Sequence, residues 1–237
     1  MNEMRMVLVG GAVHFTRELT MPRPVGARNH DFEQKRMALV DALTDFALTA
    51  DLRRPSLRQF AIAAQASEPT LRHYFDDRQG VVSAILENMG NRGKWIWELV
   101  AHPATTPTEA LEEYYRVADA GMQHGQFTRA HAFGLIEGIA DEVAGRAYLK
   151  FLLEPGLESI IEKLKGTPGG PRTREALRAA AFAVMAPLLF ISIHQKLLGG
   201  AEEAPIGPDS HGYPGLIRRL TGSAHRRFDC GYFSVGR

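Results

Sequence analysis

Cysteine is almost absent from this chain, since Cys230 is the only one among 237 residues. One cysteine forms no disulfide within a chain and contributes to no multi-cysteine metal site. The sequence therefore fits a reducing compartment, and we expect a cytoplasmic location.

Long hydrophobic runs are also scarce. The longest, residues 179–193, has 15 residues, whereas a membrane-spanning helix needs about 20. Residues 6–13 follow Arg5 and faintly resemble a signal peptide, but the run is short and has no clear cleavage site. We therefore predict no membrane partner, and we expect residues 1–30 to form a flexible arm.

Motifs of known catalytic chemistry are missing as well. The chain has no G-x-S-x-G elbow, no H-E-x-x-H pair, no Walker A loop and no G-x-G-x-x-G. His124 and His131 are separated by a predicted turn, so we predict no metal site. We expect the acidic residues Glu137, Asp141 and Glu142 to be solvated surface rather than paired carboxylates. No catalytic residue, cofactor or enzymatic activity is predicted.

An excess of positive charge is lacking too, because the formal net charge is only +1. Binding to nucleic acid would therefore have to depend on local arginines rather than on the total charge. The composition, 45% hydrophobic and 23% charged, is that of a globular chain with a large core.

What the sequence does contain is a helix-turn-helix pattern over residues 56–75, SLRQFAIAAQASEPTLRHYF. Ser56 and Gln59 have the spacing of a capping box, which predicts a helix start. Ser67 is a second N-cap, followed by Pro69 in the first turn. The turn between the helices, Gln65-Ala66, is short, which requires a close and steep helix crossing.

The second helix of this pattern has two different faces. Leu71 and Tyr74 share the inner face by helical spacing. The outer face is rich in hydrogen-bonding groups that suit a DNA groove: Arg can bind guanine, Glu can accept from cytosine, and Thr can contact a thymine methyl group. The outward residues are Glu68, Thr70, Arg72 and His73.

Residues 33–89 resemble the DNA-binding domain of the TetR family of bacterial transcriptional regulators. The resemblance depends on a combined pattern: Ser56, Phe60-Ala61, Ala64, Ser67, Leu71, Tyr74-Phe75 and Arg78. Two positions depart from the family. Gln65 stands where Gly is usual, so a left-handed backbone there would cost about 1 kcal/mol, and Arg72 stands where Tyr is frequent.

The resemblance implies an all-α fold with an N-terminal three-helix DNA-binding domain and a C-terminal helical ligand-binding and dimerisation domain. We expect the helix-turn-helix domain over residues 31–78, the second domain over 79–221 and a tail over 222–237. Apolar periodicity predicts the other helices, with a soft point at residues 90–93 and a bend at Pro155-Gly156. Their ranges are 32–49, 78–100, 108–123, 128–139, 141–165 and 173–198.

Residue roles follow from the same resemblance. We expect Arg78 to hold a DNA phosphate at a helix N-terminus and Arg58 to contact a phosphate or a base edge. The candidate DNA-binding residues are Ser56, Arg58, Ser67, Glu68, Pro69, Thr70, Arg72, His73, Tyr74 and Arg78.

Members of this family bind small, often hydrophobic effectors in the second domain, where methionine and aromatic walls would suit such a ligand. Taken singly, each of these side chains fits a solid core better than a cavity wall, and only the set and the resemblance favour a cavity. The candidate ligand-binding residues are Met89, Trp95, Tyr115, Met122, Phe133, Phe151, Phe182 and Met185.

The resemblance also implies a homodimer joined through C-terminal helices. The apolar segment 173–198 and residues 213–221 would form it, because a helix that is apolar all round must be covered on every side. The leading hypothesis is a regulator, a repressor in its usual form, that binds a palindromic DNA operator as a homodimer and releases it when a small apolar effector binds. Two alternatives remain open: a DNA-binding protein without an effector, and an enzyme or ligand carrier on an inherited fold.

Overall fold

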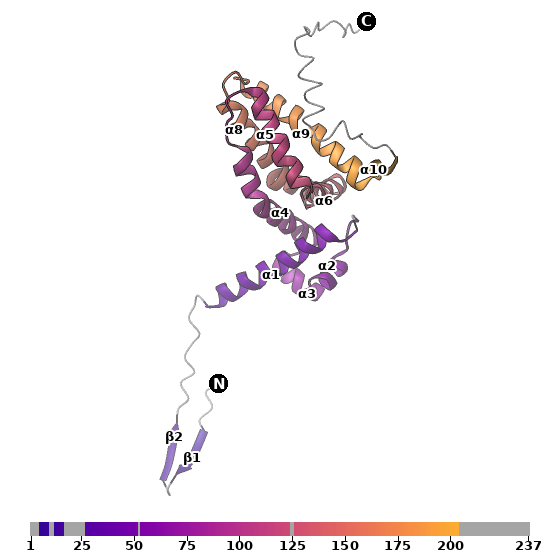
Figure 1. Ribbon diagram of the computed structural model, residues 1–237. Coiled ribbons are helices and arrows are strands. Elements are labelled where there is room, and N and C mark those ends of the chain that lie inside the picture. Colours follow the sequence, from indigo (N-terminus) through magenta and orange to yellow (C-terminus); the bar gives the residue numbers. More distant parts are fainter. Residues whose placement is uncertain (1–4, 10–11, 17–26, 52, 124–125, 204–237) are drawn as a thin grey trace, which may run out of the picture. The chain divides into compact units, whose positions relative to one another are not determined.

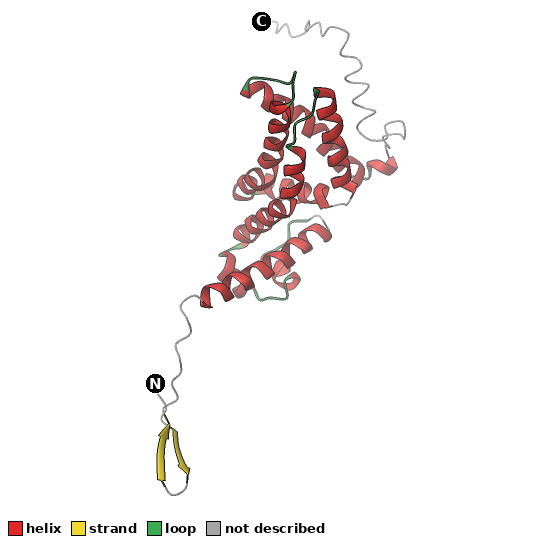
Figure 2. Cartoon of the chain, turned by 60° about the vertical axis from the view of Figure 1, so that its left-hand side comes forward, coloured by secondary structure: helices red, strands yellow, loops and turns green. Residues whose placement is uncertain are grey.

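The computed structural model describes residues 5–9, 12–16, 27–51, 53–123 and 126–203. The chain divides into two compact units, residues 1–38 and residues 39–237. Within the predicted flexible arm 1–30 the structure places an antiparallel hairpin of β1 (Arg5–Val9) and β2 (Ala12–Thr16), shown in Figure 2. Valines in both strands favour extended backbone. The apolar run that faintly resembles a signal peptide thus falls largely within two strands.

Helix α1 (Ala27–Thr49) also begins inside the predicted arm, earlier than residue 32. The division between the two units falls within this helix, after Ala38. Its last turns, from Leu39 onward, belong to the core of the second unit through Val40 and Leu43. Met37, an apolar residue of this helix, is 61% exposed.

The helix-turn-helix consists of α2 (Leu57–Ala63) and α3 (Glu68–Phe75). Both predicted caps are present. The Gln59 N–H donates to Ser56 Oγ over 3.3 Å, and the Ser56 N–H donates to Gln59 Oε1 over 2.8 Å. The Thr70 N–H donates to Ser67 Oγ over 3.1 Å. These bonds satisfy helix-end amides that have no partner within the helix, and they fix where α2 and α3 begin.

Gln65 adopts a left-handed backbone, with φ of 51°. The energetic cost of a left-handed backbone at this residue could be predicted from the sequence, because Gln occupies the turn position that favours Gly. A residue with a Cβ loses about 1 kcal/mol in this region. The backbone bond from the Ala66 N–H to the Ala61 carbonyl, 2.9 Å long, helps to hold the turn closed.

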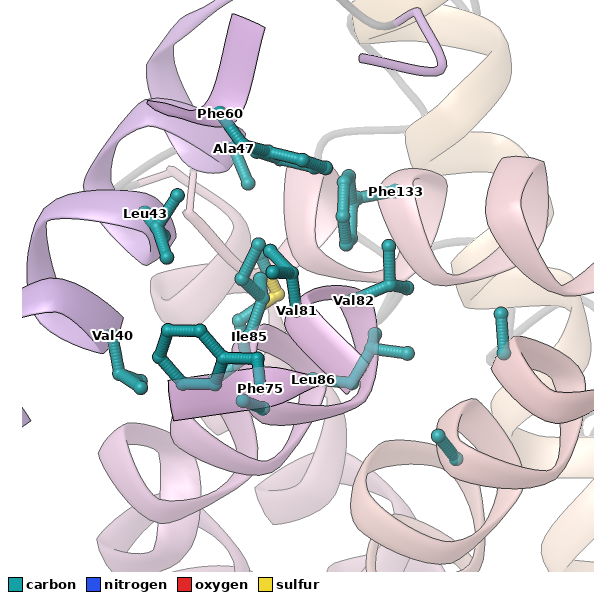
Figure 3. Packing of buried hydrophobic residues seen from close by; sticks show 14 of the residues in the cluster. Val40, Leu43, Ala47, Phe60, Phe75, Val81, Val82, Ile85, Leu86 and Phe133 are labelled. Atoms are coloured by element: carbon teal, nitrogen blue, oxygen red, sulfur yellow. The ribbon is translucent and has the colours of Figure 1, made fainter. Parts of the chain in front are cut away.

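The first core packs α2 and α3 against the end of α1 and the start of α4 (Arg78–Val100). Figure 3 shows this packing, in which Phe133 of α6 (Gln126–Ala140) belongs to the same cluster. The rings of Phe46 and Phe60 meet edge to face, with centroids 6.1 Å apart. Side chains with no exposed surface dominate it: Leu43, Phe60, Leu71, Val81, Val82, Ile85 and Leu86.

Helix α4 runs without a break from the helix-turn-helix into the remaining helices (Figure 1). The soft point expected at residues 90–93 is helical throughout. A Cβ added at Gly90 would lie 2.3 Å from the Phe151 carbonyl oxygen. The glycine is therefore required for close approach of two backbones, not for a helix break.

The remaining described helices form a bundle together with α4 (Figure 1). The bend predicted at Pro155-Gly156 takes another form: a π-helical segment, Leu149–Leu153, precedes Pro155, and the Glu154 N–H donates to the Leu149 carbonyl. Proline in the first turn of the next helix offers no N–H, so the irregular hydrogen bonding lies just before it. The helices are α5 (Pro107–Gln123), α6 (Gln126–Ala140), α7 (Glu142–Tyr148), α8 (Glu154–Gly166), α9 (Arg174–Leu197) and α10 (Gly200–Glu203).

Helix α9 buries one side in a second core with α5 and α8 and exposes the other. Among the described residues it is the one helix long and apolar enough to cross a membrane by length and composition, and about a third of its apolar window is buried (33%). Its exposed side carries large apolar groups, including Phe190 at 65% and Phe182 at 42%. Residues 213–221, predicted to pack beside it, and the tail 222–237 lie outside the described residues.

Candidate nucleic-acid interface and ligand cavity

The two faces of α3 are sharply different. Leu71 and Phe75 are 0% and 4% exposed and fix the helix to the first core. Arg72 and His73 are exposed. The Ser67 cap and the spacing of the buried residues together determine which side chains face outward. Glu68 and Thr70 on this outer face are partly exposed.

Other predicted DNA contacts lie around this helix. Ser56 and Ser67 are exposed, and their hydroxyl groups serve the two helix caps. Arg58 on α2 and Pro69 on α3 are exposed. Tyr74 is partly buried against the core, and its ring meets that of His73 at a centroid distance of 5.0 Å. Their contact with DNA stays a prediction.

Arg78 occupies a different place from the one expected. Its Nε donates to the Pro55 carbonyl over 2.7 Å, and its Nη2 lies 2.5 Å from Oε1 of Glu137. The side chain is 25% exposed, and the guanidinium is turned towards the protein. The predicted phosphate contact of Arg78 does not fit this geometry.

Glu137 on α6 was expected to be solvated surface and is fully buried instead. Its second oxygen accepts from Arg54 Nε over 3.3 Å. A carboxylate can be buried here because two guanidinium groups neutralise it and donate to it. The pattern of charges along α6 gave no sign of this, since both partners are far away in the sequence.

More polar contacts tie α1 to the bundle. Arg92 on α4 donates to Asp41 Oδ1 over 2.9 Å and to Asp45 Oδ1 over 2.5 Å. The hydrogen bond from Arg92 holds the pKa of Asp41 below its usual range. Arg129 on α6 donates to the Leu48 and Ala50 carbonyls, which end α1. These contacts connect α1, on which the helix-turn-helix packs, to helices that surround a cavity.

This cavity has a volume of about 540 Å³, within the range of about 300–1,000 Å³ typical of small-molecule sites. Its surface is mostly apolar, and α4, α5 and α6 supply most of it. The residues around it are Leu48, Met89, Arg92, Gly93, Trp95, Ile96, Trp97, Leu99, Arg116, Val117, Ala120, Gly121, Gln126, Phe127, Ala130 and Leu152.

Of the predicted ligand-binding residues, the structure brings Met89 and Trp95 to this cavity. Met185 lines a much smaller neighbouring void of about 20 Å³. Phe182 lies on the exposed side of α9. The side chain of Met122 lies outside the described residues. The other three belong to the hydrophobic clusters instead: Tyr115, Phe133 and Phe151.

His131 on α6 is buried beside this region, where Tyr148 Oη lies 2.8 Å from its Nδ1. Burial lowers the pKa of His131 to about 4, so the ring is neutral at ordinary pH. Within the described part of the chain, no three His, Cys, Asp or Glu side chains gather where they could hold a metal ion.

Comparison with solved structures shows the class of fold. A protein of Pseudomonas aeruginosa PAO1, provisionally described as a transcriptional regulator, superimposes with a TM-score of 0.57 at 17% identity, over 83% of this chain and 94% of that one. The chain has the fold of that regulator. A TetR-like transcriptional regulator from Rhodococcus sp. RHA1 aligns with a TM-score of 0.49 at 16% identity, over 86% of this chain and 98% of that one.

A TetR family repressor, AlkX from Dietzia sp. strain DQ12-45-1b, aligns with a TM-score of 0.44 at 20% identity, covering 80% of this chain and 94% of that one. No protein-family model matches the sequence of the chain. No curated protein matches it either. The comparison therefore shows the helical fold of the Pseudomonas aeruginosa protein.

Proposed function

We propose that this protein is a TetR-like transcriptional regulator that binds a palindromic operator as a homodimer and releases it when a small ligand occupies the cavity. One observation carries the proposal: α3 is fixed by Leu71 and Phe75 while Arg72 and His73 face outward. A short helix anchored on one side and rich in hydrogen-bonding groups on the other suits the major groove.

The exposed side of α9 supports the homodimer. Between residues 179 and 190 its exposed residues follow helical spacing and are all apolar, with small alanines between two phenylalanines. An apolar stripe of this length on a protein surface favours association, and a twofold pair would bury it against itself. The stripe consists of Ala179, Phe182, Ala183, Ala186, Pro187 and Phe190.

A twofold dimer would present two α3 helices to the same duplex. Successive major grooves on one side of DNA lie about 34–36 Å apart. A ligand changes the equilibrium between two geometries only by its different affinity for them. Ligand binding must therefore favour an arrangement in which the two α3 helices no longer match this spacing.

Gel retardation and footprinting on the DNA upstream of the protein's own gene test the proposal. We expect sequence-preferential protection of a palindrome at moderate salt, and a dimer by analytical ultracentrifugation. Phe190→Glu should give a folded monomer with weaker operator binding, whereas Lys165→Glu, an exposed change on α8, should leave both properties unaltered. Protection without sequence preference, or a wild-type monomer, would contradict the proposal.

Two alternatives predict other outcomes. A constitutive DNA-binding protein needs no effector, and the cavity of about 540 Å³ argues against it. An enzyme or carrier on an inherited fold needs no outward recognition face, and the exposure of Arg72 and His73 argues against that. A regulator of transcription acts where the DNA is, which supports a cytoplasmic location.

A further inference from the structure

Two arginines lie in the mostly apolar wall of the cavity. Arg92 comes from α4 and Arg116 from α5. Gln126 is the other polar side chain among the lining residues named above. Charged groups at the edge of an apolar cavity restrict which ligands can bind, because a buried ligand must satisfy or avoid them.

Arg116 has no ion pair or hydrogen bond with any side chain in the described part of the chain. Its guanidinium carries donors in a planar fork that matches a carboxylate group. A neutral ligand that covered it would remove water from the guanidinium without supplying a charge partner in its place. Arg116 is exposed, so a ligand carboxylate would pair with it at the edge of the cavity, where a ligand that partly covers the pair strengthens it relative to open water.

Arg92 is already paired, and its partners matter. It bridges Asp41 and Asp45, both on α1, and its Nη2 also donates to the Asp41 carbonyl over 3.3 Å. Val40 and Leu43, in the same stretch of helix, belong to the core that holds α2 and α3. Arg92 thus lines the cavity and at the same time holds the helix on which the helix-turn-helix packs.

We propose that the ligand is an amphipathic carboxylate, with an apolar body in the cavity and its carboxylate at Arg116 and Arg92. The ligand carboxylate competes with Asp41 and Asp45 for the Arg92 guanidinium. Occupancy therefore weakens the ion pairs between α4 and α1 and changes the position of the helix-turn-helix. This inference rests on the proposed regulator function and adds the chemical class of effector and the contact through which it acts.

Intrinsic fluorescence reports this site selectively, because the chain has 2 tryptophans, and both of them, Trp95 and Trp97, line the cavity. The purified protein is titrated with decanoate, decanol and decylammonium below their micelle-forming concentrations. These probes share one apolar body and differ in the charge of the head group. We expect decanoate to bind at least about tenfold more tightly than decanol, which corresponds to about 1.4 kcal/mol, and decylammonium to bind most weakly.

Variants separate the charge from the cavity itself. Arg116→Gln should remove the preference for decanoate over decanol, and Arg116→Lys should retain part of it. Lys94→Gln, which removes a positive charge from an exposed position of α4 outside the cavity lining, is the matched control and should keep the preference. Equal affinity for decanoate and decanol in the wild type would overturn the proposed ligand class.

The proposed competition between the ligand and the two aspartates for Arg92 is tested separately. Replacing both Asp41 and Asp45 with Asn removes the competitors for Arg92, so decanoate should bind several-fold more tightly. Decanoate should also release operator DNA from the wild type at concentrations that fill the cavity. If it fills the cavity and leaves operator binding unchanged, the proposed coupling fails.

The outcomes also distinguish this inference from the function on which it rests. A protein that retards its operator but shows no fluorescence response to any probe would retain the regulator function and lose the ligand proposal. Selective decanoate binding by a protein without operator preference would support the ligand class and contradict the regulator function.

Discussion

Arg78 Nη2 lies 2.5 Å from Oε1 of Glu137, and this pair joins the first residue of α4 to a fully buried position on α6. Arg78 also donates to the Pro55 carbonyl, one residue before the α2 cap. Arg54, beside Pro55, supplies the second guanidinium. The carboxylate thus fixes the approach to the helix-turn-helix and the start of α4 against one helix of the bundle.

Glu137→Gln should destabilise the protein by about 3 kcal/mol, because it leaves the partly buried charge of Arg78 without its counterion. Chemical denaturation of wild type and variant measures the difference. The control is Glu142→Gln, which breaks the exposed pair with Arg146 and should cost less than about 0.5 kcal/mol. Similar losses of unfolding free energy in the two variants would show that the buried carboxylate stabilises the protein no more than an exposed one.

In the proposed function the exposed side chain of Arg72 reads a base edge, so Arg72→Ala should lose about 1–3 kcal/mol of discrimination between operator and altered base pairs. Arg78→Ala should act chiefly through stability, since its guanidinium is engaged by Glu137 and Pro55. Competition assays against single-base operator variants measure the first effect. Arg146→Ala, remote on α7, is the control. Loss of discrimination with Arg78→Ala but not with Arg72→Ala would reverse these roles.

The helix-turn-helix could be predicted because its signals are local. Ser56 with Gln59, and Ser67 with Thr70, are three residues apart and determine the helix starts by themselves. The Arg78–Glu137 pair spans 59 positions of the chain. Nothing in either neighbourhood indicates the other partner, so the sequence alone assigns Glu137 to solvated surface and Arg78 to a DNA phosphate.

The cavity was predictable only in part for a related reason. Methionine and aromatic residues fill cores and line pockets alike, so composition does not separate Trp95, which faces the cavity, from Phe133, which is packed in the core. Arg116 precedes Val117, and both residues line the cavity. A charged residue beside an apolar cavity residue is a signal that the sequence contains, but Arg116 is not among the predicted ligand-binding residues.

Gln65→Gly should stabilise the protein by about 0.5–1 kcal/mol. The Gln65 backbone has φ of 51°, a region that glycine enters without the penalty of a Cβ. Gln65→Ala is the control and should give no gain, because alanine keeps the Cβ. Thermal and denaturant unfolding measure both changes. Equal stability of the glycine and alanine variants would mean that the turn stores no strain of this kind.

His131 should make stability depend on pH above the range in which carboxylates titrate. Its pKa is about 4 in the folded chain, where burial disfavours the charged ring, and about 6.5 in an unfolded one. Below pH 6.5 the unfolded state therefore binds more protons, and stability falls as pH falls from 6.5 towards 4. The loss between pH 7.5 and pH 5 should be about 2 kcal/mol.

Urea unfolding at these two pH values measures this loss. Asp41 and Glu154, whose pKa values are lowered by hydrogen bonds from Arg92 and Arg178, remain charged across the range and add little to the slope. His131→Gln, which keeps a polar group near Tyr148, should be less stable at pH 7.5 and nearly independent of pH down to 5. If the variant retains the wild-type slope, the buried imidazole is not its source.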